Sequence, residues 1–163
     1  MEKISVMVNN LYARVGATIS RNILRTQDMC LMGVSVTPCG CRVNHGSVDG
    51  FSVELIDPEK LEKNHSLYIA LFSYGKPDVI VDLSSNSFLK DEFPTFQPHI
   101  SFILSEALAS DELNKKAGKA NLNIVFLPED SSEEKIMQTL RFVNQKVKED
   151  SWGNVFTERD VKL

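Results

Sequence analysis

Short apolar runs alternate with amphipathic segments along this chain. The first run, Ile4–Val8, is rich in β-branched residues and is typical of a buried parallel strand. After a polar turn, Val15, Ile19 and Ile23 recur every four residues, which places them on one face of a helix. A strand, a tight turn and an amphipathic helix in this order are typical of nucleotide-binding βαβ folds.

The same alternation continues to the end of the chain. Apolar runs predict five further strands, at 29–36, 51–55, 78–83, 99–104 and 123–127. Start signals predict three further helices, which begin at Asp57, Ser110 and Ser131. We expect the first of these to end at Gly75, and the last to bury one apolar stripe. Strands that alternate with helices predict an α/β fold, a three-layer, Rossmann-like, doubly wound arrangement with a mostly parallel sheet.

Two stretches of the chain do not fit this alternation. The polar, glycine-containing stretch 39–50 predicts a loop. The stretch 88–98 stands where a crossover helix is expected, but Pro94 and Pro98 limit it to a short helix before Pro94.

The length of 163 residues suits a single domain with its own core. We expect residues 1–150 to form this domain. Residues 151–163 carry Trp152, Val155 and Phe156 among charged residues and have no evident place in the sheet. This tail is therefore a candidate docking arm for another protein.

Composition and charge exclude several classes of function. A hydrophobic fraction of 42% predicts a globular chain, and a net charge of −4 without a basic cluster argues against nucleic acid as a partner. No apolar run reaches the roughly 18 residues that cross a bilayer. Three cysteines, an odd number, favour reduced thiols in an intracellular compartment, either the cytoplasm or an organelle such as a plastid if the chain is processed.

The segment with Cys39, Cys41 and His45 is a candidate metal clip. A closed zinc site needs four ligands, and the sequence offers no second pair. We therefore expect a surface turn here and no metal site.

The turn after the first strand is the most informative candidate site. In dinucleotide-binding folds, a glycine-rich turn lets the backbone approach a pyrophosphate at the helix N-terminus. Here only Gly16 remains, and Asn10 and Ala13 occupy the earlier glycine positions. Asn10 tolerates a left-handed conformation, but Ala13 adds a β-carbon where the backbone should meet phosphate. The pattern predicts a weakened phosphate cradle.

Two further strand ends carry candidate ligand-binding residues. The strand at 29–36 ends without the acid that usually binds ribose hydroxyls, and the nearest cation is Arg42, which favours NADP over NAD or is a solvated loop arginine. Asp82 and Ser84 stand at the carboxyl end of the strand at 78–83, where ligands bind in open α/β sheets. Alternatively, Asp82 and Ser84 cap the segment that follows.

The order and spacing of these elements resemble the N-terminal, dinucleotide-binding domain of dihydrodipicolinate reductases, with plant-type members most similar. The resemblance runs to about Asp150. Arg14 and Gly16 match the family's Gly-x-x-Gly-Arg/Lys-Met-Gly turn, and Asp82-Leu83-Ser84 is similar to its Asp-Phe-Thr strand end. Ser105–Leu108 stands in place of its Gly-Thr-Thr-Gly loop, where the resemblance implies that Glu106 repels the cofactor.

The resemblance also bears on activity. In the family, a second domain with a His-His motif and a lysine binds and protonates the substrate. We expect this chain to lack that domain, and with it the catalytic acid and the substrate pocket. We therefore expect a non-catalytic relative, a pseudoenzyme without catalytic residues, that is a structural or assembly subunit among other protein subunits.

Two alternatives stay open. One is an NAD(P)H-binding oxidoreductase or nucleotide sensor of this type, binding NADP(H) through the following residues: Asn10, Ala13, Arg14, Gly16, Arg42, Asp82 and Ser84. The other is a regulatory module that binds another small ligand at the strand ends.

Overall fold

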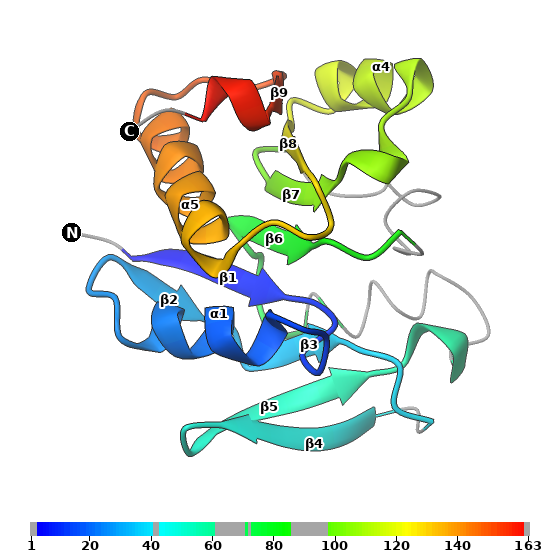
Figure 1. The fold of residues 1–163 in the computed structure, drawn as a ribbon, viewed down its shortest axis with the longest axis vertical. Helices are drawn as coiled ribbons and strands as arrows, with labels where there is room; N and C mark the ends of the chain where they lie inside the picture. The colour runs from blue at the N-terminus through cyan, green and yellow to red at the C-terminus, as the bar shows by residue number, and fades with distance from the viewer. Residues whose placement is uncertain (1–2, 41–42, 61–70, 72, 86–97, 162–163) are drawn as a thin grey trace. The chain divides into compact units, whose positions relative to one another are not determined.

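In the computed structural model (Figure 1), the chain forms two compact units, residues 1–77 and residues 78–163. The structure describes residues 3–40, 43–60, 71, 73–85 and 98–161. Each unit is an α/β structure whose strands are mostly parallel, as the alternation of apolar runs and amphipathic segments predicts.

The first unit opens with the predicted strand, helix and strand. β1 (Ile4–Val8) and β2 (Met29–Leu31) pair in parallel, and α1 (Gly16–Leu24) connects them. α1 buries Ile19 and Ile23, two members of the predicted apolar face. Burial of that face holds α1 against β1 and β2, because amphipathic helices gain most of their stability from packing.

The second sheet of this unit differs from the prediction in two respects. The run 29–36 forms two strands, because β3 (Val34–Val36) leaves β2 and pairs in parallel with β5 (Phe51–Ile56). The predicted loop at 39–50 is wrong for its second half, where β4 (Val43–Val48) pairs antiparallel with β5.

The β4–β5 hairpin is closed by a two-residue turn. Asp49 and Gly50 have φ values of 49° and 80°. Two consecutive positive φ angles are the mark of a type I′ turn, which Asp-Gly favours and whose twist matches that of a hairpin. Arg21 of α1 and Arg25, the residue that follows the helix, reach the carboxylate of Asp49 at 3.1 and 3.4 Å and join the helix to the hairpin tip.

The segment after β5 begins as a capped helix should. The Asp57 carboxylate accepts a hydrogen bond from the Glu59 N–H at 3.0 Å, and a single 3-10 turn, η1 (Pro58–Lys60), follows. The predicted continuation over residues 61–70 lies outside the described part of the chain. Gly75 has a φ of 98°, a left-handed conformation that is common just after a helix.

The second unit contains a parallel sheet in the order β6-β7-β8-β9. The predicted strands at 78–83, 99–104 and 123–127 are confirmed as β6 (Val79–Asp82), β7 (Ser101–Ser105) and β8 (Asn123–Leu127). All their residues are buried, as expected for parallel strands covered on both faces. The expected crossover segment at 88–98 lies almost wholly outside the described residues.

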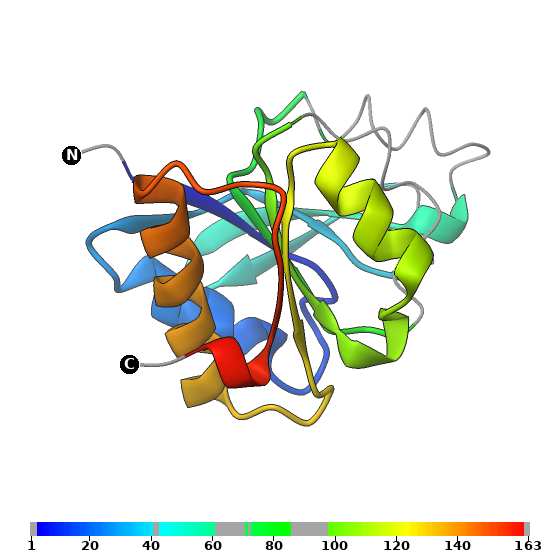
Figure 2. The same ribbon diagram turned by 90° about the horizontal axis from the view of Figure 1, so that it is seen from above.

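Two helices complete this unit. Figure 2 shows α4 (Asp111–Lys119) and α5 (Glu133–Lys148) on opposite sides of the sheet, which makes the unit a three-layer, doubly wound arrangement. Ser110 caps α4 as predicted, since its hydroxyl accepts from the Leu113 N–H at 3.1 Å. The predicted cap of α5 is wrong by one residue. Ser132 accepts from the Lys135 N–H, whereas the Ser131 hydroxyl donates to the Pro128 carbonyl.

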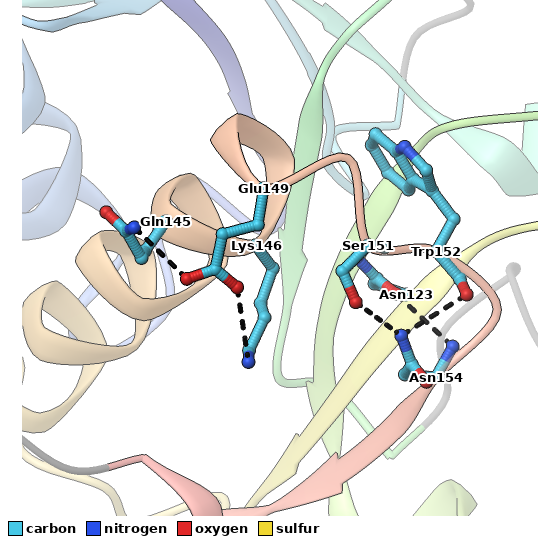
Figure 3. A network of polar contacts seen from close by, with 7 residues as sticks. All are labelled: Asn123, Gln145, Lys146, Glu149, Ser151, Trp152 and Asn154. Carbon is cyan, nitrogen blue, oxygen red and sulfur yellow. Dashed lines mark hydrogen bonds and ion pairs between the residues drawn. The ribbon is translucent and has the colours of Figure 1, made fainter.

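The tail has a place in the sheet, which corrects the sequence analysis. β9 (Val155–Thr157) pairs in parallel with β8, and a 3-10 turn, η4 (Glu158–Asp160), follows it. Asn123 of β8 holds the approach to β9, because its amide donates to the Ser151 carbonyl at 2.8 Å and accepts from the Asn154 N–H at 3.2 Å. Figure 3 shows Asn123 beside Ser151, Trp152 and Asn154. Docking of this segment onto another protein stays a prediction.

Candidate functional site

The turn between β1 and α1 is fixed to the end of β3 by buried polar side chains. Asn9 accepts from the Val36 N–H at 3.0 Å, and Thr37 accepts from the Leu11 N–H at 3.0 Å. The hydroxyl groups of Ser35 and Thr37 lie 2.7 Å apart. Asn9, Ser35 and Thr37 are each less than 5% exposed, so these bonds are shielded from water. The turn therefore has a defined shape before any ligand arrives.

The turn also explains Asn10 and Gly16. Asn10 has a φ of 53°, so it takes the left-handed conformation that the sequence analysis allowed for it in place of glycine. A β-carbon at Gly16 would lie 2.5 Å from the Asn10 carbonyl oxygen and 2.7 Å from that of Leu11. Gly16 is thus required by the packing of the turn on itself. Its N–H donates to the Ala13 carbonyl at 3.1 Å, so this amide is already engaged.

The N-terminus of α1 can receive an anion. Within the described residues, no side chain caps the helix at Val15 and no acid stands in its first turn. The first amides of a helix have no carbonyl partner inside it, and beyond Gly16 these belong to Ala17 and Thr18. Both residues are half-buried, and the preceding turn carries the exposed Arg14. By contrast, α4 and α5 each begin with a serine cap and two acids.

The loop after β3 is held by a carboxylate that the sequence analysis assigned only to helix capping. Asp57, 2% exposed, accepts hydrogen bonds from the N–H groups of Gly40 at 2.7 Å, Cys39 at 3.2 Å and Glu59 at 3.0 Å. Burial by itself raises the pKa of Asp57, but the three N–H donors and the charge of Lys60 together outweigh it and hold the pKa below its usual value. Spacing along the chain gives no signal for this contact, because β3 and β5 pair only in the folded structure.

The remaining predicted residues are not part of the β1–α1 turn. Asp82 and Ser84 belong to the second unit, at the end of β6. Asp82 is 2% exposed and accepts from the Ser84 N–H at 3.0 Å, a local cap that was the alternative role given to this pair. Arg42 lies beyond the described residues. Joint use of these residues with the β1–α1 turn stays a prediction.

Carboxyl groups also stand at the neighbouring strand ends of the second unit. The Ser105 hydroxyl, at the end of β7, donates to the Glu129 carboxylate at 3.2 Å and accepts from the Ala107 N–H. Glu106 is exposed in the 3-10 turn η3 (Glu106–Leu108) that follows β7. The stretch that stands in place of the family's glycine-rich loop is thus an acidic, self-capped turn.

The candidate metal clip is only partly described. His45 lies in β4, so a surface turn is wrong for this residue, and Cys41 lies outside the described range. Among the residues that the structure places, no three His, Cys, Asp or Glu side chains are gathered to hold a metal ion.

Comparisons with known proteins inform on the fold. No protein-family model and no curated protein matches the chain. Among solved structures, the chain is similar to a crystal structure described as a candidate NADPH:quinone reductase from Bacillus thuringiensis, with a TM-score of 0.51 and 14% identity. The match covers 92% of this chain and 46% of that one, so this chain spans less than half of that protein's length. In the described residues, no helix is both long and apolar enough to cross a bilayer. The sheet order, the helices and this likeness together give the chain a Rossmann-like α/β fold.

Proposed function

We propose that the chain binds NAD(P)H with its pyrophosphate at the β1–α1 turn, as an oxidoreductase domain or nucleotide sensor of the dihydrodipicolinate reductase type. The observation that carries this proposal is the uncapped N-terminus of α1 behind a turn held by buried hydrogen bonds. The likeness to a structure described as an NADPH:quinone reductase supports it at the level of the fold. The resemblance to dihydrodipicolinate reductases rests on the sequence.

The physical case concerns charge. The aligned peptide dipoles of a helix place roughly half a positive charge at its N-terminus. Within the described residues, no acid stands in the first turn of α1 and no side chain caps it, and Arg14 carries a positive charge in the turn before it. A diphosphate would accept hydrogen bonds from the amides of Ala17 and Thr18. Gly16 would support the turn from inside and would not contact the phosphate.

The end of β3 favours NADP(H) over NAD(H). NAD-specific sites present a carboxylate to the ribose hydroxyls after the second strand of the βαβ unit, and here β3 follows that strand, β2. Residues 37–40 contain no acid, and the carboxylate that reaches them, Asp57, uses both oxygens for backbone N–H groups. A 2′-phosphate would therefore meet no acid presented by these residues.

Titration with NADPH and NADH, followed by the melting temperature, tests the proposal. At 100 times the dissociation constant, bound nucleotide stabilises the folded protein by about 2.7 kcal/mol. Arg14→Ala should weaken binding, whereas Arg141→Ala, which removes an exposed arginine of α5, should not. The absence of a shift with either nucleotide at millimolar concentration would refute nucleotide binding.

Thr18→Glu separates phosphate binding from a general loss of structure. A carboxylate in the first turn of α1 should stabilise the free protein by about 0.3–1 kcal/mol through the helix dipole. The same carboxylate should repel the diphosphate and raise the dissociation constant. A variant that is more stable and still binds as well as wild type would contradict phosphate binding at α1.

The expected role as a structural or assembly subunit stays a prediction, and so do the expected protein partners. Nothing in the described residues favours that role over nucleotide binding. Isolation of the native protein from its source, followed by identification of the proteins that copurify with it, would address it.

A further inference from the structure

Tyr12 is exposed although the turn that carries it is rigid. Tyr12 is 65% exposed, and the other large hydrophobic residue that the structure describes as exposed is Tyr74, at 39%. The preceding residue, Leu11, is 1% exposed and its N–H is bonded to Thr37. The exposure of Tyr12 therefore belongs to an ordered part of the turn, next to the end of β3.

The outer end of the Tyr12 ring rests against β4. A β-carbon built on Gly46 would lie 2.6 Å from the Tyr12 hydroxyl oxygen and 3.6 Å from Cζ. Glycine weakens a strand interior and often marks a place where another group approaches the backbone closely. Gly46 thus leaves the space that the hydroxyl end of the ring uses, and the residue before Tyr12 is bonded to Thr37, just after β3.

We infer that the Tyr12 ring is the platform on which the adenine base of the bound nucleotide stacks. This inference rests on the proposed function. An exposed aromatic face has no charge to offer a phosphate, but it stacks well on a planar base. In Rossmann-like folds the adenosine half of the dinucleotide binds on the side of the first βαβ unit, where the end of the second strand meets the ribose. β3 follows the second strand of this βαβ unit, β2, almost directly along the chain, and Tyr12 stands beside the end of β3, so we place Tyr12 on the adenosine side.

The test compares dissociation constants for NADPH. Tyr12→Ala should raise the dissociation constant about 5- to 150-fold, the range for loss of one base–aromatic stack. Tyr12→Phe keeps the ring and should stay within about twofold of wild type. Tyr74→Ala, which removes the other exposed tyrosine, is the control for a nonspecific effect. Two fragments of the nucleotide show which ring stacks on Tyr12. Tyr12→Ala should raise the dissociation constant for adenosine 2′,5′-bisphosphate and leave that for nicotinamide mononucleotide unchanged.

Gly46→Ala tests the geometry without removing the ring. The added β-carbon would displace the hydroxyl end of Tyr12, a flexible group, at little cost to folding. It should raise the dissociation constant in the wild-type background and have no effect in the Tyr12→Ala background, because the displaced ring is then absent. If Tyr12→Ala is poorly folded, the comparison of Gly46→Ala with wild type still tests the placement of the ring, because Gly46→Ala keeps the ring and an unchanged dissociation constant would overturn the inference.

The outcomes distinguish failure of nucleotide binding from failure of base stacking on Tyr12. If wild type binds neither NADPH nor the adenosine fragment, the proposed function fails and the inference fails with it. If wild type binds and Tyr12→Ala binds equally well, only the inference is overturned. The inference is also overturned if Tyr12→Ala weakens the binding of nicotinamide mononucleotide and not that of the adenosine fragment, because a different ring would then lie on Tyr12.

Discussion

Removal of the Asp57 carboxylate should destabilise the first unit and release the loop after β3. The carboxylate connects three places in the chain, since its oxygens accept from the N–H groups of Cys39, Gly40 and Glu59. Two variants divide its contribution. Asp57→Ala removes every acceptor, and Asp57→Asn keeps the shape with one acceptor oxygen.

The size of the effect follows from the contacts. Hydrogen bonds to charged groups contribute about 1.5–3 kcal/mol each, but Gly40 and Glu59 are exposed and water can replace part of the loss. At about 1 kcal/mol for each of the three bonds, Asp57→Ala should lower the free energy of unfolding by about 3 kcal/mol. Asn can keep the two bonds made to one oxygen, but its NH₂ then faces the third donor. Asp57→Asn should therefore cost about 1–2 kcal/mol.

The effect should depend on pH. The pKa of Asp57 is lower in the folded state than its usual value of 3.8, so the unfolded chain binds the proton first as the pH falls. The stabilisation is complete above the unfolded pKa and is lost as the pH falls through the lower folded pKa. The difference in stability between wild type and Asp57→Asn should thus be constant from pH 7 to about 5 and shrink below about 4.

Urea unfolding of the two variants and wild type at several pH values measures these differences. Glu59→Ala is the matched control, because it removes a neighbouring exposed carboxylate and keeps the Glu59 N–H; it should change stability by less than about 0.5 kcal/mol. If Asp57→Ala costs no more than Glu59→Ala, or if the difference does not shrink in acid, the carboxylate does not hold this loop.

Three other substitutions test the packing, two that should destabilise the protein and one that should stabilise it. Gly16→Ala should lower the free energy of unfolding by about 1–3 kcal/mol, because its β-carbon would meet backbone carbonyl oxygens that cannot move aside easily; a neutral effect in urea unfolding would contradict the close approach. Gly118→Ala, in α4, should stabilise by about 0.5–1 kcal/mol, since nothing lies within 4 Å of the added carbon; a lower melting temperature would count against this. Asn123→Ala should cost about 1–3 kcal/mol and increase hydrogen exchange in β9, because it removes two bonds that hold the tail; unchanged exchange at Val155 would show that the tail is held by other contacts.

The strands and helices were predictable where one physical signal determined them. The runs at 78–83 and 123–127 have apolar centres, Val79–Val81 and Ile124–Leu127, and short apolar runs of this kind are typical of strands covered on both faces. Ser110 precedes two acids and an apolar stripe, so the start of α4 follows from capping alone. The start of α5 was misplaced by one residue because both Ser131 and Ser132 can cap, and their neighbours do not distinguish them.

The β4–β5 hairpin was missed although its signal is present. Asp49-Gly50 is a strong hairpin signal, but β4 contains Gly46 and polar residues, so its side-chain pattern resembles that of a loop. The strand is specified by the turn and by pairing with β5. The split of 29–36 into β2 and β3 could not be predicted either, because both halves are mostly apolar and only their pairing partners, β1 and β5, differ.

The glycine pattern of the β1–α1 turn has a different meaning once the contacts are known. Loss of the first two glycines suggested that the phosphate cradle had eroded. In the structure Asn10 takes the left-handed conformation itself, and Gly16 is required by carbonyl groups of the same turn. The glycines of such turns are therefore required first by the backbone conformation of the turn. A chain can replace some of them and keep the same backbone conformation. Affinity for an anion depends instead on what neutralises the helix N-terminus. At α1 that position is uncapped and without acid, so the missing glycines are weak grounds for expecting a pseudoenzyme, and the Thr18→Glu variant addresses the question more directly than any comparison of turn sequences.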